Sequence, residues 1–227
     1  MPPDSMPVQE IPARVRAQLL GRGEWVDPND REPTDGLARA IRQSGDQRRT
    51  FAAAVGLLLT DDDPALRAGA AAVLHLVADE LGAPHLARLL TEHPERYRGV
   101  RPAGVTLGGE DIAWTMLTAM AKVTRPQDRD AVHLLRGAVT EPERGSRLLA
   151  DLARVDPDWV TANARDVVPH RATGVLLRLD RPHRERLARA LAPYPEELKT
   201  LLGPPFWRQL PPDEAEALKA LMWPETP

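Results

Sequence analysis

The stretch that decides the fold runs from Leu58 to Leu74 and reads LLTDDDPALRAGAAAVL. It begins at the end of an apolar run that starts at Phe51, and it passes through three aspartates to Pro64. Proline suits the first turn of a helix, an aspartate before it can cap that helix, and acidic side chains suit the positive end of the helix dipole. The stretch therefore predicts a helix, a tight turn and a second helix.

Apolar side chains in the second helix recur at intervals of three and four residues. They are Leu66, Ala70, Val73, Leu74, Val77 and Leu81. This spacing places them on one face, so we expect a helix over 64–81 with that face buried. The runs 51–59 and 112–121 are apolar on nearly all sides, which predicts the two most buried helices and places Trp114 in the core.

Prolines repeat the same punctuation along the chain. Those that precede a segment with helical character are Pro64, Pro94, Pro126, Pro142, Pro157, Pro169, Pro182, Pro195 and Pro212. From Pro126 onward they recur roughly every 15 residues, and the two earlier gaps are about twice as long. One helix per interval indicates a helical array. An irregular bundle of short helices punctuated by proline is the alternative.

The Leu58–Leu74 stretch resembles the centre of a HEAT repeat, in which an Asp-Pro turn joins two helices and an arginine follows soon after the second one starts. Asp61 to Asp63 and Arg67 match those positions, and the resemblance implies an Asp–Arg contact that bridges the turn. Weaker echoes at 140–143 and 155–158 lack the arginine. We therefore expect an all-α, HEAT-like α-solenoid of antiparallel helix pairs that is irregular in its C-terminal half.

Composition agrees with one α-helical repeat domain over residues 1–227, with disordered tails at 1–8 and 224–227. Hydrophobic residues make up 42%, enough for a core, and the apolar set is dominated by Ala and Leu. The chain has no cysteine, which excludes disulfides and thiolate metal sites. The polar start lacks the pattern of a signal peptide, and no apolar run approaches about 20 residues. We expect a cytoplasmic protein that does not enter a membrane, and the excess of Arg over Lys is typical of bacterial-type, GC-rich coding.

Charge is unevenly distributed along the chain, although its net value is only −3. Residues 61–95 hold seven acids against two arginines, a net of −5, and residues 165–189 hold seven arginines against three acids, a net of +4. Such a layout can steer a charged partner to one surface. A solvated charged face is the alternative.

Three arginines of the basic segment are predicted to contact an acidic partner. Arg171 and Arg178 are seven positions apart and share one flank of a helix. Arg186 has no acidic residue three or four positions away, whereas its neighbours Arg181, Glu185 and Arg189 can pair among themselves. Acidic side chains of other helices, such as those at 213–216, could instead neutralise the three arginines.

Motifs of catalysis or metal binding are absent from the sequence. It contains no Walker, His-Glu-x-x-His or Gly-x-Ser-x-Gly pattern, so we expect no catalytic residues and no cofactor, and we regard an enzyme as the less favoured class. His75 and Asp79 lie four apart but lack a third ligand, so we expect no metal site. Trp25, in the long connection 21–36, is a further candidate partner contact. The alternative for Trp25 is that the loop folds back over the core.

Helical arrays commonly act by binding, so we expect a non-catalytic scaffold or adaptor that binds another protein through one face. The alternative is a DNA-binding HEAT-like protein of the DNA glycosylase and repair type. It would use the Arg-rich segment 165–189, with Asp158, Trp159 and Arg165 as candidate groups. The acidic net charge and the aromatic content of 4% make nucleic acid the second choice.

Overall fold

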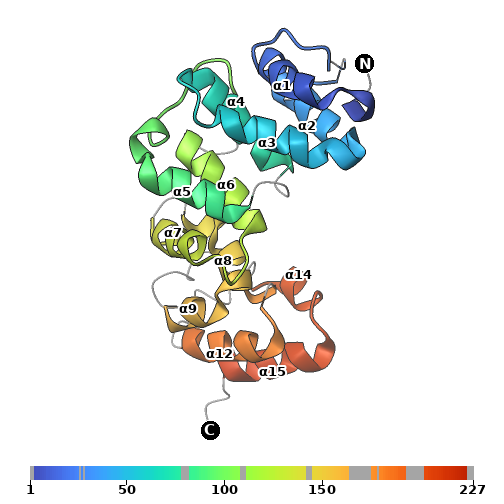
Figure 1. Ribbon diagram of the computed structural model, residues 1–227. Helices are drawn as coiled ribbons and strands as arrows, with labels where there is room; N and C mark the ends of the chain where they lie inside the picture. Colours follow the sequence, from blue (N-terminus) through green and yellow to red (C-terminus); the bar gives the residue numbers. More distant parts are fainter. Residues whose placement is uncertain are drawn as a thin grey trace. The chain divides into compact units, whose positions relative to one another are not determined.

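All regular structure in the computed structural model is helical (Figure 1). The structure describes residues 3–25, 27, 29–77, 82–107, 111–141, 145–163, 175–177, 179–192 and 202–223. These residues contain no strand, which confirms the all-α class, and none of their helices is long and apolar enough to cross a bilayer. The chain divides into two compact units, Met1–Thr124 (unit 1) and Arg125–Pro227 (unit 2). The single repeat domain expected from the sequence stays a prediction.

The described residues of unit 1 form six α-helices and four 3-10 turns. They are η1 Pro3–Ser5, η2 Val8–Glu10, α1 Ile11–Leu19, α2 Pro33–Gln43, η3 Gly45–Gln47, α3 Arg48–Leu58, α4 Pro64–Val77, α5 Ala83–Glu92, η4 Pro94–Arg96 and α6 Ile112–Val123. Each of the first three helices contacts its successor in the chain, and α6 contacts both α4 and α5. The next-but-one pairs α1–α3 and α2–α4 are in contact as well. Unit 1 is therefore stabilised by contacts between helices that are adjacent in the chain and between helices that are two apart.

Helix α4 is the centre of unit 1, because it contacts α1, α2, α3 and α6. Its predicted apolar face is at most 3% exposed at Leu66, Ala70, Val73, Leu74 and Val77. Position 81 lies outside the described residues. Gly69 lets α1 approach closely, since a Cβ there would lie 3.2 Å from the side chain of Leu19. The predicted amphipathic helix is therefore confirmed over 64–77.

Helix α6 is buried as predicted, and Trp114 is 2% exposed. Helix α3 is largely buried as well, but one narrow face of it is open to solvent. Phe51 and Val55 are fully buried, but Ala53 is exposed and Leu57 keeps 68% of its surface in solvent. Helix α3 contacts α1, α2 and α4, and an apolar composition cannot tell the covered faces from the open one.

The N-terminal stretch predicted as a disordered tail is described from residue 3. Met6 is 2% exposed, and the Gln47 side chain donates hydrogen bonds to the main-chain oxygens of Met6 at 2.9 Å and Asp4 at 3.4 Å. These contacts attach the segment to the start of α3. Residues 224–227 lie outside the described residues.

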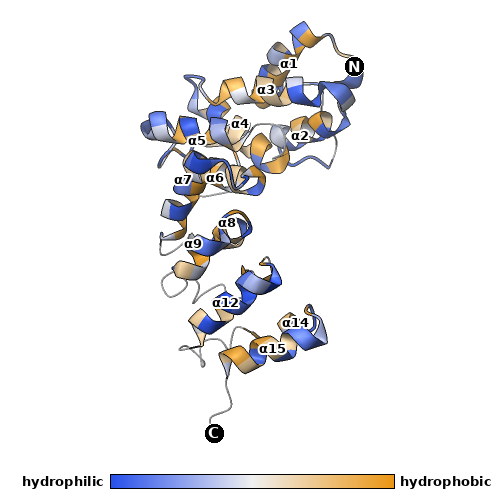
Figure 2. Ribbon diagram, turned by 60° about the horizontal axis from the view of Figure 1, so that its bottom comes forward, coloured by the Kyte–Doolittle hydropathy of each residue, from blue (hydrophilic) through white to orange (hydrophobic). Residues whose placement is uncertain are grey.

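Unit 2 contains short helices. They are α7 Arg129–Val139, η5 Gly145–Arg147, α8 Leu149–Val155, α9 Pro157–Ala162, α12 Arg181–Leu191, α14 Pro204–Trp207 and α15 Pro212–Met222. The pairs α7–α8, α8–α9, α9–α12 and α12–α15 are in contact. Figure 2 shows α12 mainly in hydrophilic colours, yet Leu187 and Ala188 on it are fully buried. Leu135, Leu152 and Val160 are also fully buried, so a narrow apolar stripe per helix forms this core.

The proline punctuation is confirmed at five of the six described positions. Pro126 precedes α7 by three residues, whereas Pro94 begins only the 3-10 turn η4. Pro64, Pro157, Pro182 and Pro212 lie in the first turns of α4, α9, α12 and α15. The two long gaps hold the extra helices α5 and α6. Helix α6 begins without proline, and Asp111 caps it by accepting a hydrogen bond from the Trp114 main chain at 2.7 Å. The positions 142, 169 and 195 lie outside the described residues.

Candidate functional site

Trp25 is held against unit 1 by a buried glutamine of α1. Gln18 is 1% exposed, accepts a hydrogen bond from the Trp25 main chain at 3.2 Å, and donates to the Trp25 and Pro33 oxygens at 3.1 and 3.2 Å. The indole packs edge-on against Phe51 with ring centroids 5.5 Å apart. A Cβ on Gly36 would meet the Trp25 oxygen at 1.9 Å, so only glycine fits there. The loop folds back over the core and leaves the indole half-buried.

The arginines of α12 all have a carboxylate within 4.0 Å. The pairs are Arg181–Glu185 at 3.1 Å, Arg189–Glu185 at 4.0 Å, Arg186–Asp158 at 2.7 Å, and Arg184–Glu214. The predicted pairing among residues 181, 185 and 189 is thus confirmed. Arg186 obtains its partner from α9, which its own helix could not supply. Both side chains of that pair stay largely exposed, at 48% and 74%.

The other two predicted partner arginines, Arg171 and Arg178, lie outside the described residues. Trp25 belongs to unit 1 and Arg186 to unit 2. The partner-binding role of these four residues therefore stays a prediction. Of the two described residues, Trp25 packs against Phe51 of the core, and Arg186 forms an exposed ion pair with Asp158.

The turn between α3 and α4 is bridged by Arg67, which is 7% exposed. Its Nη1 atom donates to the main-chain oxygens of Asp61 and Asp62 at 2.7 and 2.9 Å. The contact implied by the HEAT resemblance is therefore present, but it reaches the main chain and not a carboxylate. Asp63 caps α4 by accepting from the Ala65 main chain at 2.8 Å.

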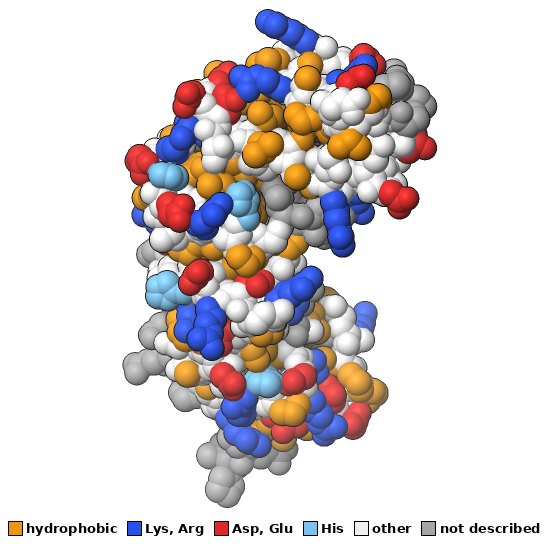
Figure 3. Space-filling model, in the orientation of Figure 1, with side chains coloured by type: hydrophobic (Ala, Val, Ile, Leu, Met, Phe, Trp, Pro, Cys, Tyr) orange, Lys and Arg blue, Asp and Glu red, His pale blue; other side chains and the backbone are white. Residues whose placement is uncertain are grey.

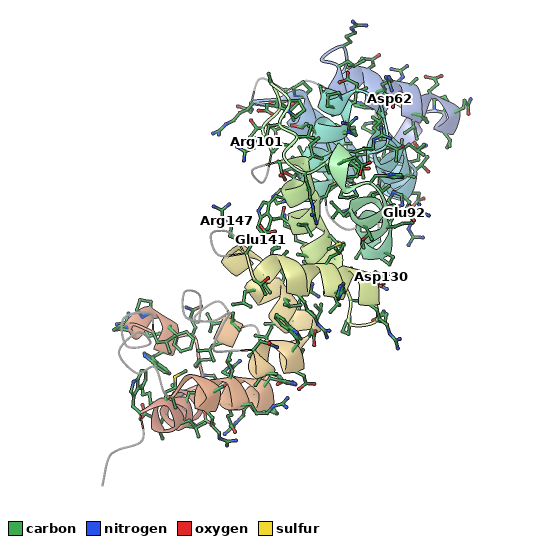
Figure 4. The ribbon with its side chains drawn as sticks, turned by 90° about the vertical axis from the view of Figure 1, so that its left-hand side faces the viewer. Asp62, Glu92, Arg101, Asp130, Glu141 and Arg147 are labelled. Atoms are coloured by element: carbon green, nitrogen blue, oxygen red, sulfur yellow. The ribbon has the colours of Figure 1, made fainter. Side chains whose placement is uncertain are left out.

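Two further arginines hold the same turn from outside. The Asp61 carboxylate pairs with Arg16 of α1, and this hydrogen bond, followed by the one from the Asp63 main chain, keeps the pKa of Asp61 below its usual range. Arg96 donates to the oxygens of Thr60 and Asp61 at 2.9 Å. Figure 4 labels Asp62 on this turn. Arginines of α1, α4 and η4 therefore all bind this turn, which indicates a structural role.

The outward face of α3 carries an unusual exposed leucine. In the described residues the large hydrophobic side chains with at least 40% exposure are Val8, Leu20, Leu57 and Leu76, all in unit 1. Leu57 is the most exposed at 68%, and Ala53, one turn earlier, is exposed as well. Figure 3 shows hydrophobic side chains on the surface of unit 1 where Figure 1 draws α3. Contiguous exposed apolar surface is typical of protein contact sites.

A second candidate is a hollow of about 310 Å³ between α2, α4 and the segment that follows η4. Its lining consists of Arg31, Glu32, Thr34, Asp35, Ala72, His75, Leu76, Thr106 and Leu107. Glu32 joins α2 to that segment, because its carboxylate accepts hydrogen bonds from the main chain of Thr106 at 3.1 Å and from its hydroxyl. All the lining residues belong to unit 1, so the hollow is complete within that unit.

His75 lies at the edge of this hollow in a defined hydrogen-bond arrangement. The Thr118 hydroxyl donates its proton to the Thr115 oxygen at 2.9 Å, so at 3.0 Å it accepts from Nδ1 of His75. Lys122 donates to the His75 main-chain oxygen at 2.9 Å and lies 3.4 Å from Nε2. Burial first, and then the Lys122 charge, lower the pKa of His75. The imidazole is therefore neutral near pH 7, with the proton on Nδ1.

Asp79, the other half of the predicted weak metal pair, lies outside the described residues. Within the described part of the chain no group of three or more His, Cys, Asp or Glu side chains could hold a metal ion.

Sequence reasoning missed three residues on which these surfaces depend: Gln18, Thr34 and Leu57. Gln18 had a readable signal, since with Ile11 and Val15 it falls at the positions i, i+4 and i+7 of one helix face. A polar side chain on such a face predicts a buried hydrogen-bonding role. Thr34 and Leu57 had no readable signal in the sequence, because their surroundings come from segments distant in the chain.

Comparisons with protein-family models, with curated proteins and with solved structures give no match for this chain.

Proposed function

We propose that this chain is a non-catalytic scaffold or adaptor, an α-helical array of HEAT-like helix pairs that binds another protein through one face. The observation that carries the proposal is the outward face of α3, where Leu57, at 68%, is the most exposed large hydrophobic side chain among the described residues. Burying a leucine side chain contributes about 1.5–3 kcal/mol, which a monomer forgoes at this position.

The contacts in unit 1 support an array. In a two-layer array each helix packs against the next one, in the opposite layer, and the next but one, in its own layer. The pairs α1–α2, α2–α3 and α3–α4 fit the first class, and α1–α3, α2–α4 and α4–α6 fit the second. Helices α1 and α3 then form one layer, and α2, α4 and α6 the other. Each layer keeps an outward face for a partner.

The proposal includes a second, electrostatic contact in unit 2. There Arg186, together with Arg171 and Arg178, which lie outside the described residues, contacts acidic side chains of the partner. Its pair with Asp158 is largely exposed, and exposed pairs are worth only about 0–1 kcal/mol. An acidic partner side chain can therefore replace Asp158 at little cost. We place the protein in the cytoplasm, as its sequence predicts.

The DNA-binding alternative gains no support from the described part of the basic segment. Arg184 pairs with Glu214 and also donates to the main-chain oxygens of Leu176 and Leu179 at 2.8 and 2.7 Å, so it is not available to a phosphate. A nucleic-acid surface depends on cations available to phosphates. Retention on heparin at low salt, lost at moderate salt, would favour the DNA alternative over a protein partner.

The test compares three immobilised baits in a lysate of the cells that express the protein: the wild type, Leu57→Glu and Gln43→Glu. The control puts the same charge on an exposed position of α2, in the other layer. We expect one set of proteins to be retained by the wild type and the control and reduced about tenfold or more by Leu57→Glu. Equal recovery on all three baits, with unchanged thermal midpoints, would refute the proposed face.

A further inference from the structure

The start of α12 holds a histidine ring between two carboxylates. Asp180 caps the helix by accepting a hydrogen bond from the His183 main chain at 3.0 Å, and it accepts a second one from Nδ1 of the same residue at 2.5 Å. On the other side of the ring, Nε2 lies 3.6 Å from Oδ1 of Asp158, which belongs to α9. The imidazole therefore links α12 to α9, the helix against which it packs.

The position of the proton on the neutral ring follows from these contacts. A carboxylate only accepts hydrogen bonds, so Nδ1 carries the proton that it donates to Asp180. Nε2 is then bare, and its lone pair faces the Asp158 oxygen without attraction. The hydrogen bonds from His183, first that of the main chain and then that of the ring, lower the pKa of Asp180, so this acceptor stays ionised over the range in which histidines titrate.

The same oxygen of Asp158 is also the acceptor for Arg186. Nη2 of Arg186 donates to Oδ1 of Asp158 at 2.7 Å. The arginine and the aspartate are both largely exposed, whereas the His183 side chain is only 21% exposed. Exposed ion pairs are weak, so a second donor at this oxygen can displace the arginine.

The other charged groups of the neighbouring helices have partners of their own. Between α12 and α15 the ion pairs are Arg181–Asp213 at 3.6 Å and Arg184–Glu214. At the start of α9, Asp156 pairs with Arg136. Among the described residues, the charged groups next to the His183 ring are therefore Asp158, Asp180 and Arg186.

We propose that His183 is a pH-sensitive switch for the partner contact at Arg186. When the ring gains its second proton, Nε2 becomes a donor and takes the Asp158 oxygen, and Arg186 is released toward an acidic side chain of the partner. The positive charge of the ring adds to the attraction for the same side chain. Histidine side chains change charge between about pH 5 and 8, so binding at this contact strengthens as the medium becomes mildly acidic.

The switch rests on the electrostatic contact proposed above, but the exchange of Asp158 between its two donors needs no partner. It is also independent of the outward face of α3. Binding through Leu57 can therefore hold where the switch fails, and the two are tested separately.

The exchange is tested by a pH titration of the full chain that follows the NMR signal of the Arg186 Nε–H group. We expect this signal to shift between about pH 7.5 and 5.5, and the shift to fall at least about threefold in His183→Gln and in Asp158→Asn. His133→Gln is the control, because it removes another exposed histidine of unit 2 and should leave the titration unchanged. A wild-type signal that does not move, or that moves equally in His183→Gln, would overturn the exchange.

The effect on binding is tested with immobilised wild type, His183→Gln, His183→Arg and His133→Gln in the cell lysate at about pH 7.5 and 5.5. The probe is the set of proteins that the wild type retains and Arg186→Glu does not. The wild type and His133→Gln should retain at least about threefold more of this set at the lower pH, and His183→Gln should show no change. The permanently charged His183→Arg should bind at both pH values as the wild type does at the lower one.

Two results of the binding experiment would overturn the switch: equal retention by the wild type at both pH values, or a pH dependence that survives His183→Gln. If no retained protein depends on Arg186, the electrostatic contact falls and the switch falls with it. Retention that still depends on Leu57 would show in that case that the scaffold function stands without this contact.

Discussion

Two turns of the molecule start from the same sequence signature and are completed in different ways. Between α3 and α4 of unit 1, and between α8 and α9 of unit 2, an aspartate precedes the proline that begins the second helix. The first turn takes Arg67 from its own second helix, whereas the matching position in the second turn is the fully buried Val160. There Arg136 of α7 supplies the guanidinium and donates from Nε to Asp156 at 2.6 Å.

The difference teaches where an arginine can be predicted. The contact of Arg67 is implied by the resemblance of this stretch to a HEAT repeat, in which an arginine follows soon after the second helix starts. Arg136 precedes its aspartate by 20 positions, and it also lies 5.9 Å from the centroid of the Trp159 ring. The first arginine is 7% exposed as a residue, and the side chain of the second is 41% exposed. The local solution is therefore the more deeply buried one.

The largest effect is expected in the helix that the first turn starts. Leu74→Asp places a carboxylate without a partner on the buried face of α4 and should cost about 4 kcal/mol of unfolding free energy. Leu76→Asp on the same helix is the control, because Leu76 is 40% exposed and should lose less than about 1 kcal/mol. Urea unfolding measures both. Similar losses would show that α4 has no buried face.

The next effect separates the two turns. Arg67→Ala removes two hydrogen bonds to main-chain oxygens and leaves a gap in the core, at a cost of about 3 kcal/mol. Arg136→Ala removes a partly exposed ion pair and its packing on Trp159, at a cost of about 1 kcal/mol. Chemical denaturation of the two variants tests this order. A loss for Arg136→Ala that equals or exceeds the loss for Arg67→Ala would contradict it.

A smaller effect concerns pH at the first turn. The pKa of Asp61 is lowered in the fold, mainly by the hydrogen bond from Arg16, so the unfolded chain takes up the proton more readily. The stability that this carboxylate contributes is present above its usual pKa of 3.8 and is lost as the pH falls below that value. The thermal midpoint of Asp61→Asn should lie below that of the wild type at about pH 6, and the gap should narrow as the pH falls below 3.8.

Asp62→Asn is the control for this pH effect, because the Asp62 side chain is fully exposed. Its midpoint should follow that of the wild type across the whole range. A gap for Asp61→Asn that stays constant from pH 6 to 3 would mean that ionisation of Asp61 adds nothing to the turn.

The smallest effect is expected at the exposed arginines of unit 2. Changing Arg171, Arg178 and Arg186 to Glu should change the unfolding free energy by less than about 0.5 kcal/mol for the described pair Arg186–Asp158. It should weaken association with the protein partner at low salt. Unaffected association would identify the three arginines as solvated surface, and a large loss of stability would identify them as ties within the chain.

Several features of the fold could be predicted because short-range chemistry determines them. Proline lacks the main-chain N–H donor and restricts φ, which suits the first turn of a helix. Pro64, Pro157 and Pro212 each mark a helix start for this reason. The three-and-four spacing from Leu66 to Val77 specifies a buried face without knowledge of its neighbours. The pairing of Arg181 with Glu185 follows from one turn of helix.

The candidate surfaces needed the tertiary structure, since each combines groups from separate segments. The sequence by itself determined the helical class, the helix starts at several prolines and the core face of α4, because these depend on neighbours within about one helical turn. Only the tertiary structure decided that Leu57 is exposed, that Asp158 pairs with Arg186, and that Thr34 lines a hollow with Leu76. Those outcomes depend on which distant helix covers a side chain, and no local spacing contains that information.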